Sequence, residues 1–88
     1  MNEEKPNVQW DALFASTDVA EVLRHKQRNV VAVHNVRRLP NGAVELWRIT
    51  ERPGTPAESV RVGTCTLDTV KAEVEKIRRR MESDGWKP

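Results

Sequence analysis

Two histidines and one cysteine are the side chains of this chain best suited to metal binding or nucleophilic chemistry. They are His25, His34 and Cys65. None lies at a metal-ligand spacing such as Cys-x-x-Cys, and the sequence has no glycine-rich phosphate loop and no Gly-x-Ser-x-Gly motif. We expect the histidines to be structural or solvent-facing and the cysteine to be a small core or half-buried residue. The sequence therefore predicts a protein that is not an enzyme, with no metal site and no cofactor.

Arginines form the second group of candidate functional residues. Four of them flank a predicted turn, namely Arg37, Arg38, Arg48 and Arg52. Arginines on an open sheet face suit the phosphate backbone of nucleic acid or an acidic protein surface. The alternative is that their stems shield aliphatic neighbours and only keep the face soluble.

A secondary basic cluster follows near the end of the chain, at Arg78, Arg79 and Arg80. Successive residues of a helix point about 100° apart, so the three arginines point in different directions. Spacing of i,i+4 predicts ion pairs between Glu75 and Arg79 and between Arg78 and Glu82. A solvated helix face is one interpretation of this cluster, and a phosphate clamp is the other.

Net charge is a weak guide to the partner. Fifteen basic residues against thirteen acidic ones give +2, which is too little to indicate nucleic acid by itself. The charge is uneven, however. Residues 1–23 hold one base against five acids, residues 24–52 seven bases against two acids, and residues 53–88 seven bases against six acids. An acidic start and a basic middle can steer an acidic partner or pair with each other.

The elements that must position these residues are predicted from local patterns. Residues 1–7 are expected to be a flexible N-terminal tail, and residues 8–85 a single α+β domain. Apolar residues at helical spacing over 8–16 predict a short helix or a hydrophobic plug, and a capping box at Asp18 and Glu21 predicts a helix over 17–28.

Three strands and a second helix follow. Residues rich in β-branched side chains predict strands over 29–39, 43–51 and 59–66, with a possible bulge at Gly63. The apolar stripe of the last segment predicts a helix that Thr66 can cap and Gly85 can end; the stripe comprises Leu67, Val70, Val74, Ile77 and Met81. The predicted order is α-β-β-β-α, a three-stranded antiparallel meander with helices packed on one face.

The turn between the first two predicted strands leaves two registers open. A loop over 40–42 makes the paired residue numbers sum to 82, and a loop over 41–42 makes them sum to 83. In both registers Arg48 and Arg52 share a face, joined by Arg38 or Arg37 respectively. We expect Trp47, on the opposite face, to point to the helices as core, and the arginines to line the open face.

Two family resemblances bear on function. The order α-β-β-β-α resembles that of double-stranded-RNA-binding domains, although Asp68 and Glu73 stand where that family places cations at the start of its final helix. The run VRVGTCTLDTVKAEVEKI resembles the final strand and helix of the PC4-type single-strand DNA-binding fold. That resemblance implies a curved sheet with basic and aromatic residues, and a dimer formed through the helix.

The sequence therefore predicts a small macromolecule-binding domain. It binds nucleic acid through a basic sheet face, or else it is a protein-interaction module such as an adaptor or inhibitor of the phage or mobile-element type. An open sheet face or edge predicts a homodimer. One cysteine, a polar N-terminus and the absence of a long apolar run predict a cytoplasmic protein that has no membrane partner.

Overall fold

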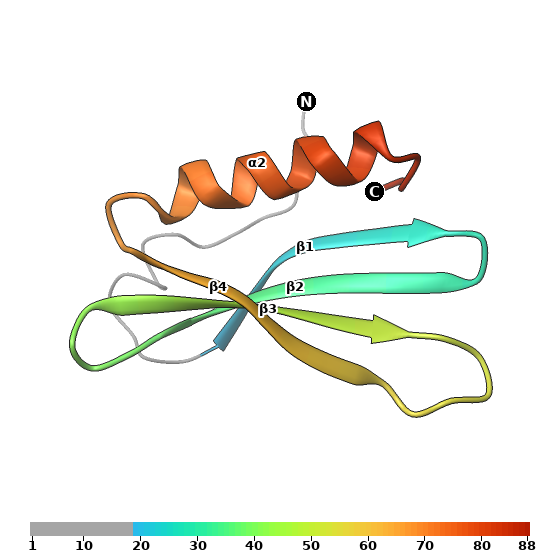
Figure 1. The fold of residues 1–88 in the computed structure, drawn as a ribbon, viewed down its shortest axis with the longest axis horizontal. Helices are drawn as coiled ribbons and strands as arrows, with labels where there is room; N and C mark the ends of the chain where they lie inside the picture. The colour runs from blue at the N-terminus through green and yellow to red at the C-terminus, as the bar shows by residue number, and fades with distance from the viewer. Residues whose placement is uncertain (1–18) are drawn as a thin grey trace.

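A four-stranded antiparallel sheet and one helix make up the fold in the computed structural model, which describes residues 19–88 (Figure 1). The strands follow chain order across the sheet, so each one pairs with the next. They are β1 (Val19–Gln27), β2 (Val30–Arg38), β3 (Ala43–Glu51) and β4 (Glu58–Thr66), and the helix is α2 (Val70–Ser83). The predicted tail and the short helix or plug over 8–16 lie outside the described residues.

The predicted order α-β-β-β-α is wrong, because the segment predicted as a helix over 17–28 is strand β1 in its described part. The register shifts between Glu21 and Leu23, which leaves Val22 as the extra residue of a bulge. Two consecutive side chains, Val22 and Leu23, are therefore buried on the same side of the sheet. This break in the two-residue alternation imitates the i,i+3,i+4 spacing of an amphipathic helix.

The hairpin between β2 and β3 forms in one of the two predicted registers, the one with the longer loop over 40–42. The amide of Leu39 donates to the carbonyl of Ala43 at 2.8 Å, and that of Gly42 donates to the carbonyl of Leu39 at 2.9 Å. Gly42 has a φ of +90°, which a residue without a Cβ adopts without strain. Paired residues sum to 82, so His34 pairs with Arg48.

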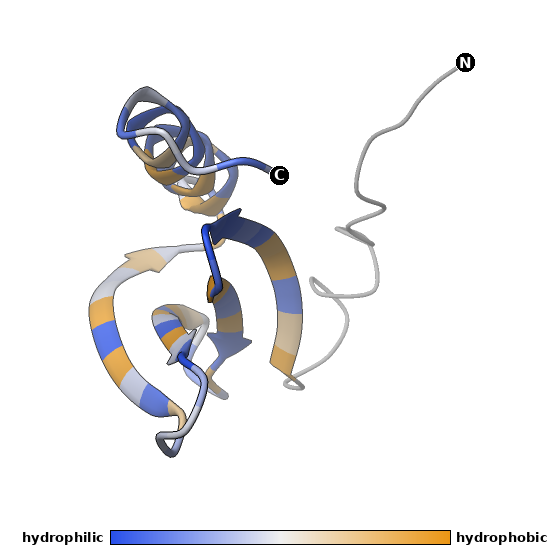
Figure 2. Ribbon diagram, turned by 90° about the vertical axis from the view of Figure 1, so that its right-hand side faces the viewer, coloured by the Kyte–Doolittle hydropathy of each residue, from blue (hydrophilic) through white to orange (hydrophobic). Residues whose placement is uncertain are grey.

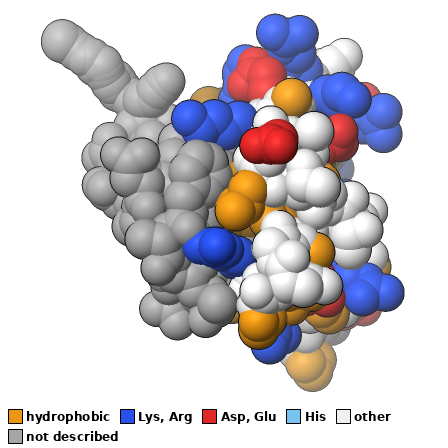
Figure 3. Space-filling view, turned by 90° about the vertical axis from the view of Figure 1, so that its left-hand side faces the viewer, with side chains coloured by type: hydrophobic (Ala, Val, Ile, Leu, Met, Phe, Trp, Pro, Cys, Tyr) orange, Lys and Arg blue, Asp and Glu red, His pale blue; other side chains and the backbone are white. Residues whose placement is uncertain are grey.

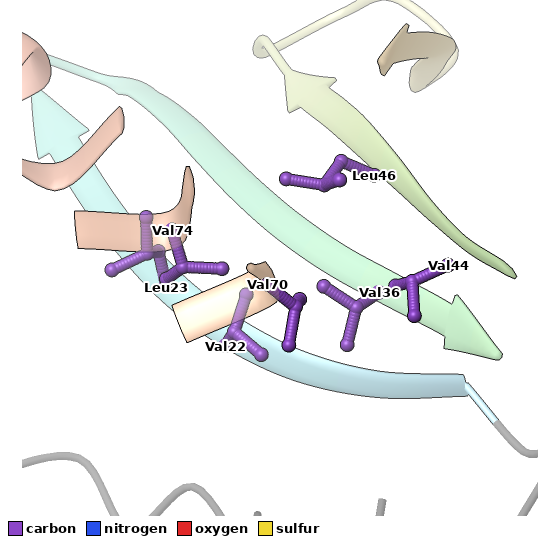
Figure 4. Packing of buried hydrophobic residues seen from close by; sticks show 7 residues of the cluster. All are labelled: Val22, Leu23, Val36, Val44, Leu46, Val70 and Val74. Carbon is purple, nitrogen blue, oxygen red and sulfur yellow. The ribbon is translucent and has the colours of Figure 1, made fainter. Parts of the chain in front are cut away.

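Helix α2 lies across one face of the twisted sheet, with its hydrophobic residues on the side turned toward the strands (Figures 1 and 2). The predicted stop is confirmed, because Gly85 has a φ of +95° and the Trp86 amide donates to the carbonyl of Met81 at 3.0 Å. The helix buries two valines of the predicted stripe in the core. Figure 4 shows the core cluster, which comprises Val22, Leu23, Val36, Val44, Leu46, Val70 and Val74.

The expectation that Trp47 points to the helix is wrong. Val44 and Leu46, which have the opposite parity, are buried beneath α2, and Trp47 is half-buried on the other face. Its indole Nε1 donates to Glu45 at 3.1 Å on that face. Because side chains alternate along a strand, Arg48 lies on the same side of the sheet as the helix.

The two outer strands differ in what covers their edges. Beside β1, the Lys26 amide donates to the carbonyl of Lys87 at 2.7 Å, and the Lys87 amide donates back to Lys26 at 2.8 Å. At the other side of the sheet, every residue of β4 except Cys65 is exposed. No helix within residues 19–88 is long and apolar enough to span a membrane.

Candidate binding site

A crevice of about 330 Å³ lies between α2 and the β3–β4 side of the sheet. It is lined by apolar residues at its floor and by polar and charged residues around them. The lining residues are His34, Leu46, Arg48, Val62, Gly63, Thr64, Glu73, Lys76, Ile77, Arg80 and Met81. This volume is at the small end of the range of ligand-binding clefts, which suits one side chain or a small organic molecule.

A glycine and a bulge on β4 leave room for the crevice. Gly63 pairs with Leu46, and a Cβ placed on this glycine meets no atom within 4 Å. The register shifts between Leu46 and Trp47, so that Trp47 pairs with Arg61 and Val62 is the extra residue of the bulge. The predicted bulge is therefore confirmed beside Gly63. The sheet wall of the crevice lacks a side chain at this point.

Three cations surround the opening. Arg48 comes from β3, and Lys76 and Arg80 come from successive turns of α2. Lys76 forms an exposed pair with Glu73 at 3.4 Å. Within residues 19–88, Arg48 and Arg80 form no ion pair. The opening therefore presents two arginines whose charge is not neutralised locally.

The imidazole of His34 forms the interior polar part of the crevice. It is 3% exposed, and its Nδ1 has no hydrogen-bond partner among the described residues. Burial, followed by the charges of Arg48 and His25, lowers the pKa of His34 from 6.5 to about 4. His34 is therefore neutral at pH 7, and it has one hydrogen to donate and one lone pair to offer.

The second histidine is buried nearby but serves a different contact. His25 Nε2 lies 3.2 Å from a carboxylate oxygen of Glu82, which joins β1 to α2. Neither histidine is solvent-facing, because both are buried. That they are structural and not catalytic stays a prediction. Their positions beneath the helix depend on long-range packing, which residue spacing does not reveal.

The predicted hairpin arginines do not form one group. Arg37 is exposed on the face opposite the helix, whereas Arg38 and Arg48 have the parity of the helix-covered face. Arg38 pairs with Val44 near the hairpin turn, and Arg48 pairs with His34 farther along the strands. Arg52 follows the end of β3 and forms a 3.6 Å ion pair with Glu58. Of the four, Arg48 alone lines the crevice.

The secondary basic cluster is divided in the same way. Arg78 forms ion pairs with Glu75 and Glu82, and Arg79 pairs with Glu75 at 3.1 Å, which confirms the predicted i,i+4 pairs. The hydrogen bond from Arg78 is the main cause that lowers the pKa of Glu75 to about 2. Figure 3 shows acidic side chains interspersed among the cations at the helix end of the molecule. Arg80 is the member that joins Arg48 at the crevice.

The thiol offers little to chemistry at this site. Cys65 is half-buried against the core, as predicted, and burial raises the pKa of its thiol. A raised pKa keeps the thiol protonated and weakly nucleophilic at neutral pH. Among residues 19–88, no three His, Cys, Asp or Glu side chains come together in a way that could hold a metal ion.

Comparison with known proteins gives no relative for this chain: no family model, no curated protein and no solved structure matches it. The segment that resembles the PC4-type fold comprises most of β4 and α2, and it is a strand followed by a helix. The site must therefore be interpreted from its own geometry. Among the described residues, that geometry offers a strand edge with no further strand beside it, next to a small crevice with cations at its opening.

Proposed function

We propose that this protein is a non-enzymatic binding domain that takes up an extended, acidic segment of a partner protein along the open edge of β4. The observation that carries the proposal is the juxtaposition of this edge strand, exposed at every residue but Cys65, with the arginine-rimmed crevice. Within residues 19–88, β4 pairs with β3 alone. An exposed edge strand presents unpaired backbone groups that an extended segment can satisfy by adding a strand.

The side chains of the edge support an apolar contact with the partner. Val60 is 54% exposed and Val62 is 43% exposed. Val60 pairs with Arg48, and Val62 lines the crevice, so both lie on the side of the sheet that carries α2. A partner strand that places apolar residues over these valines also turns the residues two positions away to the same side of the sheet, where the crevice lies.

Charge complementarity favours an acidic partner. Arg48 and Arg80 have no ion-pair partner within the described chain, and the only carboxylate of the crevice, on Glu73, is paired with Lys76. Carboxylates that an added strand turns to the α2 side of the sheet would meet uncompensated positive charge. Such complementarity accelerates association and fixes the register of a partner strand.

The test uses a ten-residue peptide in which every second residue is valine or glutamate in turn and the residues between are threonine, so that valine and glutamate lie on one face of the strand. A second peptide has lysine in place of each glutamate. Titration into ¹⁵N-labelled protein should shift the amide resonances of β4 with the acidic peptide and leave them unchanged with the basic one. The double substitution Val60→Thr and Val62→Thr should weaken binding by about tenfold, because each replaces a methyl group that the partner would bury by a hydroxyl. Val19→Thr, at an exposed valine of β1, is the matched control.

Nucleic acid is the second candidate partner, and the convergence of Arg48, Lys76 and Arg80 on one opening is the observation that favours it. Retention of single- or double-stranded nucleic acid at low salt, without any shift from the acidic peptide, would replace the first proposal by this one. A second copy of the chain could also occupy the β4 edge as a homodimer, which light scattering over a range of concentrations would detect. The cytoplasmic location stays a prediction.

A further inference from the structure

We propose that the crevice between α2 and β4 is a carboxylate site, in which His34 supplies the interior hydrogen bond and Arg48 and Arg80 supply the charge. It takes a carboxylate carried on a short apolar chain. The carboxylate comes from a glutamate or aspartate of the partner segment, an identity that rests on the function proposed above, or from a free organic acid of the same chemistry.

The floor of the crevice suits an apolar chain. Leu46 and Met81 are buried beneath it, and Ile77 is half-buried at its side. Gly63 leaves the sheet wall open, since a Cβ at this residue would meet nothing within 4 Å. The space of about 330 Å³ holds a chain of a few carbon atoms and excludes a large ligand.

The interior of the crevice holds hydrogen-bonding capacity that no described residue uses. Only 3% of His34 is exposed, and it forms no hydrogen bond with any residue of the described range. Buried polar groups in native proteins are rarely left without a partner. A carboxylate oxygen that accepts a hydrogen bond from the imidazole would remove this deficit.

The rim has the charge and geometry for the other carboxylate oxygen. A guanidinium presents a planar set of N–H donors that matches a carboxylate, and Arg48 and Arg80 both reach the crevice without an ion pair inside the described chain. Arg48 lies directly across the strand pair from His34. The apolar floor distinguishes this arrangement from a site for inorganic phosphate, which has no apolar part to bury.

The probes are hexanoate, its uncharged analogue hexanol, acetate and inorganic phosphate. Each is titrated into ¹⁵N-labelled protein while the ring nitrogens of His34 and the amides of Gly63 and Thr64 are observed by NMR. Hexanoate should shift all three residues and raise the pKa of His34, because a bound anion stabilises the imidazolium. Hexanol, acetate and phosphate should each bind at least about tenfold more weakly than hexanoate, since each lacks the charge or the chain.

Three variants and a matched control locate the contact. Arg48→Gln should weaken hexanoate binding by about tenfold, and Gly63→Val should do so by filling the crevice. Arg37→Gln removes the same charge from an exposed arginine on the opposite face and should leave the affinity unchanged. His34→Leu keeps an apolar side chain of similar size, so a folded variant that no longer binds would confirm the interior contact.

Equal binding of hexanol and hexanoate, or an unchanged His34 resonance at saturating hexanoate, would overturn the carboxylate site. If phosphate bound more strongly than hexanoate, the apolar floor would not be part of the binding site. The proposed strand addition is tested separately, because Val60→Thr should weaken binding of the acidic peptide and leave binding of hexanoate unchanged. If hexanoate binds and the peptide does not, the site stands and a free acid is its ligand.

Discussion

The buried imidazole of His34 predicts that the protein loses stability in mild acid. Its pKa is lowered from 6.5 to about 4, first by burial and then by the charges of Arg48 and His25. The unfolded chain binds a proton at this group near pH 6.5, and the native state binds it only near pH 4. As the pH falls from 6.5 to 4, proton uptake therefore favours the unfolded state, and the free energy of unfolding decreases.

The magnitude follows from the shift. One pKa unit corresponds to about 1.4 kcal/mol, so His34 should remove roughly 2.5 kcal/mol from the free energy of unfolding between pH 7.5 and pH 4.5. A small domain has a total of only about 5–15 kcal/mol. The other charged side chains that line the crevice with this ring are Lys76, Arg80 and Glu73.

Urea unfolding at pH values from 7.5 to 4.5, followed by far-ultraviolet circular dichroism, measures this loss. His34→Leu is the reference, because leucine binds no proton and the contributions of all other groups cancel in the difference. The range stops at pH 4.5 because Glu21 and Glu45 have lowered pKa values, caused mainly by hydrogen bonds from Arg24 and Trp47 respectively. Their contributions are present at higher pH and are lost below this range.

The wild-type protein should lose stability faster than His34→Leu as the pH falls. Arg48→Gln should show a shallower slope than the wild type, because removal of the neighbouring cation raises the pKa of His34. Parallel pH profiles for the wild type and His34→Leu would refute the reasoning, since they would show that the imidazole titrates alike in the native and unfolded states.

Three further predictions concern the turn, the core and the rim. Arg28 has a φ of +57° in the β1–β2 turn, so Arg28→Gly should raise the free energy of unfolding by about 1 kcal/mol in a urea titration, and an unchanged midpoint would contradict this. Val74→Ala should lower it by about 2 kcal/mol by leaving a cavity, whereas Val60→Ala at the exposed edge should change it by no more than about 0.5 kcal/mol. If nucleic acid is the partner, the double substitution of Arg48 and Arg80 by Glu should abolish its retention while the circular dichroism spectrum stays that of the wild type. The logarithm of the wild-type affinity for duplex DNA should fall with that of the salt concentration with a slope of roughly −0.9 per phosphate contacted.

Those elements of the fold that depend on local signals could be predicted from the sequence. The β2–β3 hairpin follows from Pro40, Asn41 and Gly42, because this tripeptide supplies the turn geometry regardless of what packs around it. Helix α2 follows from its apolar stripe and from Gly85. Each of these patterns is long or chemically specific enough to override other influences.

Strand β1 could not be predicted by the same means. The bulge at Val22 depends on pairing with β2, and without that pairing the residues of β1 match a helix better than a strand. The face of the sheet that α2 covers was missed for a related reason. Each face changes character along the strands, apolar at Val36 and Leu46 and polar at Arg48, so the choice depends on where the helix docks.

The crevice combines residues that no short motif links. His34 and Arg48 come together through strand pairing, and Arg80 joins them only when α2 packs on the sheet. Gly63 was the one local signal, because a glycine within a strand indicates a bulge or an open space. Whether this open space can hold a ligand depends on the helix opposite, and the sequence of β4 does not specify where that helix packs.

The backbone bridge between Lys26 and Lys87 has a consequence for how the chain is made. Strand β1 leaves the ribosome before the rest of the sheet, but the residue that pairs with the outer side of Lys26 is synthesised after α2. A nascent chain therefore lacks this backbone pair until translation has passed Lys87, and unpaired edge groups promote association between unfinished chains. Slow synthesis of the segment after β4 should increase aggregation in the cell, because this end of β1 then stays unpaired for longer.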